Sequence, residues 1–173
     1  MKRISTTGRG TATSPTTSTP TGIKRVFYRG DDVAYLDMGW APVTVGLITS
    51  EKAWLREMKR MKVLGAGEFI PSEFHAVCHE FESDDGHIVA IVAIDAASLI
   101  DLDPNQVIGT LVHECTHVWQ ILRDSIGEHR PSHEFEAYQL EWIVKNMLDP
   151  LSKSMDQARS LAAKQEKEKV ATP

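Results

Sequence analysis

The sequence has few cysteines, no long apolar run and no acidic residue near its beginning. Its two cysteines, Cys78 and Cys115, are too few for a disulfide framework, which favours a reducing compartment. No stretch of about 18 apolar residues is present, and no apolar segment follows the first basic residues. We therefore expect a cytoplasmic protein without a signal peptide or a transmembrane segment.

Outside the N-terminal tail, positive charge is not gathered into a basic stripe. The net charge is −5, and the rest of the chain has no basic stripe. Proteins that bind nucleic acid or an anionic membrane usually carry such a stripe. We therefore expect neither nucleic acid nor a membrane among the partners.

Residues 1–22 differ from the rest of the chain because they contain almost nothing apolar. Their Thr, Ser, Pro and Gly residues cannot bury enough surface to offset the entropy of ordering, so we expect a disordered arm. An alternative role for this arm is docking on a neighbouring protein in an assembly. The 173 residues, 42% of them apolar, otherwise fit one soluble globular domain. We place this domain at residues 23–150, followed by a C-terminal helix and charged tail at residues 151–173.

The apolar pattern predicts a mixture of strands and helices, which indicates an α+β fold. The predicted strands cover residues 23–28, 33–37, 43–49, 74–81 and 87–95. Residues 83–86 predict a hairpin turn, and the strand after it is so apolar that we expect burial on both faces. The predicted helices cover residues 51–63, 104–124, 133–148 and a stretch after Pro150. Ser50, Asp103 and Ser132 are the expected N-caps.

The motif H-E-x-x-H lies within the second predicted helix. His113 and His117 are four residues apart, so both imidazoles lie on one helix face and can bind a single ion. Two neutral imidazoles at this separation suit a tetrahedral zinc site. Glu114 lies about 100° round the helix, in the general-base position of zinc hydrolases. The pentapeptide therefore predicts a catalytic zinc centre.

The other residues of this helix support the same interpretation. At 100° per residue, one side carries apolar residues and the histidine side carries polar ones. The apolar set is Ile108, Leu111, Cys115, Val118 and Leu122, and the polar set is Gln106, Thr110 and Gln120. Core histidines would lie on the apolar side, so this pattern argues that the two histidines face a polar space.

A zinc ion on two histidines needs a third protein ligand. The third predicted helix offers Glu134 and Glu136, which point about 160° apart on a helix. Glu136 falls on the apolar arc, where an unpaired carboxylate is costly. A site of three histidines that uses His129 or His133 is a further alternative. The spacing alone leaves these alternatives open.

At this point the chain resembles the zincin metallopeptidases, in particular the gluzincin branch. There the H-E-x-x-H helix is completed by a glutamate on the next helix, often within E-x-x-A-D. Glu134 and Ala137 match this pattern, with Tyr138 in place of the aspartate. The resemblance covers residues 86–148 and is similar to small single-domain members found in bacteria and their phages. It implies Glu134 as the third zinc ligand.

The resemblance also implies a fold and an activity. The expected fold is a small mixed or antiparallel sheet packed on the motif helix, with residues 87–94 as the edge strand that pairs with extended peptide. The expected activity is zinc-dependent hydrolysis of a peptide or protein substrate, with Glu114 as general base on a zinc-bound water. Tyr138, His129 and His133 are the candidate oxyanion donors.

A second hypothesis is a structural or binding protein on the same scaffold. In such a protein, for example a virion-associated component encoded by a phage, zinc only holds two helices together. Glu114 argues against this hypothesis, because a structural zinc site has no need of a carboxylate beside its first histidine.

Overall fold

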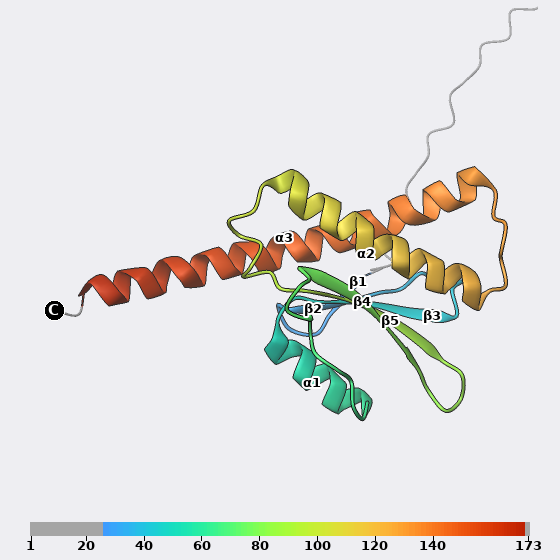
Figure 1. The fold of residues 1–173 in the computed structure, drawn as a ribbon, viewed down its shortest axis with the longest axis horizontal. Helices are drawn as coiled ribbons and strands as arrows, with labels where there is room; N and C mark the ends of the chain where they lie inside the picture. The colour runs from blue at the N-terminus through green and yellow to red at the C-terminus, as the bar shows by residue number, and fades with distance from the viewer. Residues whose placement is uncertain (1–25, 172–173) are drawn as a thin grey trace, which may run out of the picture.

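The computed structural model describes residues 26–171 and contains one five-stranded sheet and three helices (Figure 1). The strands are β1 (Val26–Tyr28), β2 (Val33–Leu36), β3 (Val43–Ile48), β4 (Ala76–Glu82) and β5 (Ile88–Ile94). The helices are α1 (Glu51–Met61), α2 (Pro104–Ser125) and α3 (His133–Ala171). The predicted N-terminal arm and the first three residues of the first predicted strand lie outside the described residues.

The sheet is mixed and has the strand order β1-β2-β3-β5-β4. Its pairs are antiparallel except β3 with β5, which run parallel. Helix α1 covers one face, and α2 and α3 cover the other (Figure 1). The expected α+β class is therefore confirmed.

Strand β5 is buried on both faces, as its continuous apolar sequence predicts. Val92 and Ile94 pack in the core that α2 and α3 cover, and Ile91 and Ala93 pack in the core under α1. Because β5 lies between β3 and β4, it is an interior strand. The expectation that residues 87–94 form the edge was wrong, and the edge beside α2 is β4.

The local signals for turns and helix ends have the predicted structures. The Ser50 side chain accepts a hydrogen bond from the backbone N–H of Ala53 at the start of α1. Asp103 and Gln106 form a capping box at the start of α2. Ser83 accepts the backbone N–H of Gly86 in the hairpin between β4 and β5. These contacts fix where the elements around the motif helix begin and end.

Helix α3 continues through Pro150, which corrects the prediction of separate helices on either side of this residue. Proline removes one helical hydrogen bond and costs about 3 kcal/mol in a helix interior. The cost is offset because apolar residues recur at every fourth position across the proline. These residues, Ile143, Met147, Leu151 and Met155, are all buried in the main core. Residues 151–155 therefore pack with the preceding domain.

None of the helices within residues 26–171 is both long enough and apolar enough to cross a membrane.

Candidate functional site

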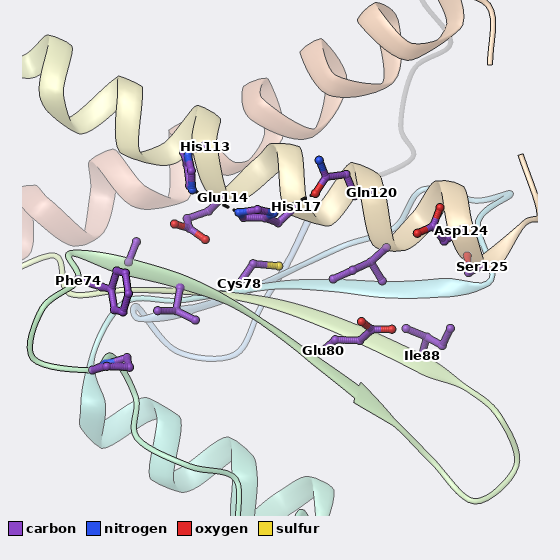
Figure 2. A pocket seen from close by; sticks show the side chains of 14 residues that line it. Phe74, Cys78, Glu80, Ile88, His113, Glu114, His117, Gln120, Asp124 and Ser125 are labelled. Carbon is purple, nitrogen blue, oxygen red and sulfur yellow. Dashed lines mark hydrogen bonds between the residues drawn. The ribbon is translucent and has the colours of Figure 1, made fainter. Parts of the chain in front are cut away.

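A cleft of about 710 Å³ lies between α2 and the edge strand β4, and all three motif residues line it (Figure 2). His113, Glu114 and His117 come from α2, and Cys78 and Glu80 come from β4. The motif was predictable from the sequence. The contribution of β4 was not, because it depends on which strand ends the sheet.

The two histidines are arranged as ligands of one ion would be. Their Nε2 atoms are 3.2 Å apart, and both side chains are exposed. Two nitrogens bound to a tetrahedral zinc at 2.0–2.1 Å are about 3.3 Å apart. The rings meet at 83°, and the two Nε2 atoms are within hydrogen-bond distance of each other, a contact that one shared ion would replace. His113 and His117 could therefore supply two of the protein ligands that a zinc ion requires.

Gln120 holds the second histidine in place, a role that was not predicted from the sequence. Its Oε1 lies 2.9 Å from Nδ1 of His117 and accepts the proton of that nitrogen (Figure 2). Nε2 of His117 then carries the lone pair, which is the form in which a histidine nitrogen binds a metal. Residues that orient a ligand histidine in this way usually also raise its basicity. The signal in the sequence was the position of Gln120 on the histidine side, three residues after His117.

Glu114 is the buried carboxylate of the cleft. It is 6% exposed, points toward β4 in Figure 2, and accepts no hydrogen bond from the part of the chain that the structure describes. No buried side-chain oxygen of the described residues lacks a hydrogen-bond partner, so the Glu114 oxygens are open to the solvent of the cleft.

Cys78 lies across the cleft from Glu114. Burial raises the pKa of the Cys78 thiol to about 12, and the charges of Glu114 and Glu80 add to this effect. Cys78 therefore remains a neutral thiol at pH 7 and adds no negative charge to the cleft.

The apolar side of α2 is largely as predicted. Leu111, Cys115, Val118 and Leu122 are fully buried, whereas Ile108 is 45% exposed. The prediction of a buried Ile108 was therefore wrong.

The candidate third ligands on α3 do not line the cleft. Glu136 is half-buried, and its Oε1 accepts a hydrogen bond from Nε1 of Trp119 at 2.9 Å, which satisfies its carboxylate on the apolar arc. Glu134 is exposed. Within residues 26–171, no three His, Cys, Asp or Glu side chains are grouped closely enough to hold a metal ion. The third ligand therefore stays a prediction.

The proposed oxyanion donors also lie outside the cleft. His129 and His133 are exposed near the beginning of α3. Tyr138 lines a separate pocket of about 340 Å³ with Trp40 and Trp142. A donor role for any of the three would require the segment that carries it to move toward the motif helix.

The chain matches no protein-family model, no curated protein and no solved structure.

Proposed function

We propose that the protein is a zinc-dependent metallopeptidase with a zincin-like fold, and that the cleft between α2 and β4 is its active site. The convergence of the two Nε2 atoms at 3.2 Å carries the proposal. That spacing suits one tetrahedral ion, and it occurs beside a buried carboxylate in a cleft of about 710 Å³. The edge strand β4 forms the opposite wall and offers unpaired backbone groups to an extended peptide.

His113 and His117 are the proposed zinc ligands. A bound zinc ion would supply Lewis acidity, which polarises a peptide carbonyl and acidifies water. Gln120 keeps the His117 ring in the tautomer and orientation that binding requires. Glu114 takes a proton from the attacking water and transfers it to the leaving amine. Its carboxylate is open to the cleft that the two histidines also line, which is where the attacking water would lie.

Glu134 is the proposed third ligand. Recruiting Glu136 would break its hydrogen bond to Trp119 and leave a buried indole N–H without a partner. Glu134 has an exposed side chain in the first turn of α3, directly after the loop of residues 126–132. A shift of this turn toward α2 therefore disturbs less of the core when Glu134 is the ligand. A site that uses His129 or His133 would also draw on this region.

One observation favours the alternative of a binding or structural protein on the same scaffold. No third ligand accompanies the histidine pair in the described residues, as a finished catalytic centre would have. The buried carboxylate of Glu114 is the argument for catalysis, since a structural site gains nothing from it.

The substitution Glu114→Gln separates the two functions. For a peptidase, zinc content stays near that of the wild type while hydrolysis of a denatured protein substrate falls by a factor of about 10³ or more, because the base is lost. Glu128→Gln, at an exposed position of the loop after α2, is the matched control and keeps full activity. Equal hydrolysis by wild type and the Glu114 variant would refute the proposed role of Glu114, and no hydrolysis by zinc-loaded wild type would favour the scaffold.

A further inference from the structure

We propose that the cleft selects extended peptides that carry a Lys or Arg side chain two or three residues before the scissile bond. This inference rests on the proposed function and names its substrate class. It follows from the charge of the cleft, from the distance between its acidic end and the motif, and from the direction of the edge strand.

The charged side chains that line the cleft are all acidic. In the described part of the chain they are Glu80, Glu114 and Asp124, and neither Lys nor Arg lines it. Asp124 already pairs with Arg123 at 3.2 Å, so Glu80 is the main group left to meet a ligand cation. The carboxylate of Glu114 lines the same cleft, nearer its Phe74 end (Figure 2). At the end formed by Glu80 and Asp124, away from the histidine pair, the cleft therefore favours a basic side chain over an acidic one.

The acidic end lies at a defined distance from the motif. Asp124 follows His117 by seven helical positions, which is roughly 10 Å at 1.5 Å per residue. Glu80 follows Cys78, the strand residue opposite Glu114, by two positions, or about 7 Å. An extended peptide advances about 3.3 Å per residue. The acidic side chains therefore lie two or three peptide residues from the bond that is cleaved.

The direction of β4 decides on which side of that bond the basic residue falls. The strand runs from the Phe74 end of the cleft to the Glu80 end (Figure 2). A peptide added to this edge pairs best in the antiparallel sense, so its N-terminal part lies near Glu80 and Asp124. Its C-terminal part then meets Phe74 and Pro71, which favour an apolar side chain after the scissile bond.

A peptide library digested with zinc-loaded wild-type protein tests the selectivity, with cut sites identified by mass spectrometry. Lys and Arg should be enriched over Glu and Asp on the order of tenfold at the second or third residue before the cut. Glu80→Gln should reduce this ratio to about threefold, as should an increase in salt, because exposed charges are screened. Asp101→Asn, at an exposed position outside the cleft, is the control and keeps the wild-type ratio.

Binding to the Glu114→Gln variant separates a failure of this inference from a failure of the proposed function. Fluorescence anisotropy compares two labelled peptides that differ only by Lys or Glu at the selected position. Tighter binding of the Lys peptide, weakened by adding Glu80→Gln, shows that the cleft selects a basic side chain through Glu80, whether or not the wild type cleaves the peptide. Equal binding of the two peptides overturns the inference, and so does cleavage without preference for a basic residue.

Discussion

The substitution Gln120→Ala tests whether α2 is built to hold a metal. In the structure, the Gln120 side chain makes one contact with the motif, the 2.9 Å hydrogen bond to Nδ1 of His117. Loss of such an outer contact typically lowers metal affinity 10–100-fold. Since His117 is exposed, water can replace the lost partner, and we expect about a tenfold loss, or about 1.4 kcal/mol. Stability without metal should change by less than about 0.5 kcal/mol, because the position is exposed.

The assay is a zinc titration in competition with a chromophoric chelator. Gln165→Ala, on the exposed end of α3, is the matched control and should bind zinc as the wild type does. Gln120→Glu retains an acceptor oxygen and should restore the affinity that alanine removes. Unchanged affinity in Gln120→Ala would refute the role of Gln120, and a loss in Gln120→Glu as large as in alanine would show that the acceptor is irrelevant.

Two further predictions concern stability. In urea unfolding, Leu111→Ala should destabilise the fold by about 2 to 5 kcal/mol because Leu111 is fully buried. Ile108→Ala should cost about 0.5 kcal/mol or less because Ile108 is 45% exposed, and equal losses in the two variants would contradict the packing of α2. Burial raises the pKa of Glu57, but hydrogen bonds from Arg60 and Tyr35 together have a larger, opposite effect, so the pKa is lowered in the folded protein. The charged Glu57 therefore stabilises the fold at pH values above its unfolded pKa of about 4.3. This stabilisation is lost as the pH falls through the folded pKa. Glu57→Gln should therefore cost about 3 kcal/mol at pH 7 and progressively less as the pH falls through the folded pKa. A cost independent of pH would contradict a stabilising ion pair between Glu57 and Arg60, which are 2.7 Å apart.

The parts of the fold that were predictable from the sequence depend on neighbouring residues. The cap at Ser50, the capping box at Asp103 and the hairpin at Ser83 each involve residues a few positions apart. The motif helix belongs to the same group, because His113 and His117 share a face in any α-helix. The histidine pair of the candidate site could therefore be predicted from residues close together in the sequence.

The parts that were not predictable depend on long-range packing. The parallel pairing of β3 with β5 places β5 inside the sheet and leaves β4 at the edge, and no local pattern encodes this order. Continuation of α3 through Pro150 depends on burial of Leu151 against the rest of the core. The position of Glu136 beside Trp119 follows from how α3 crosses α2. The third ligand could not be decided from the sequence for the same reason.

Zinc content per chain is the most direct test of the central claim. Elemental analysis would be performed on chelator-free wild-type protein and on the variants His117→Ala, Glu134→Ala and Glu136→Ala. We predict about one zinc per wild-type chain, lost in His117→Ala and Glu134→Ala and retained in Glu136→Ala. Absence of zinc from the wild type even after reconstitution, or retention of zinc in His117→Ala, would contradict a metal centre on α2.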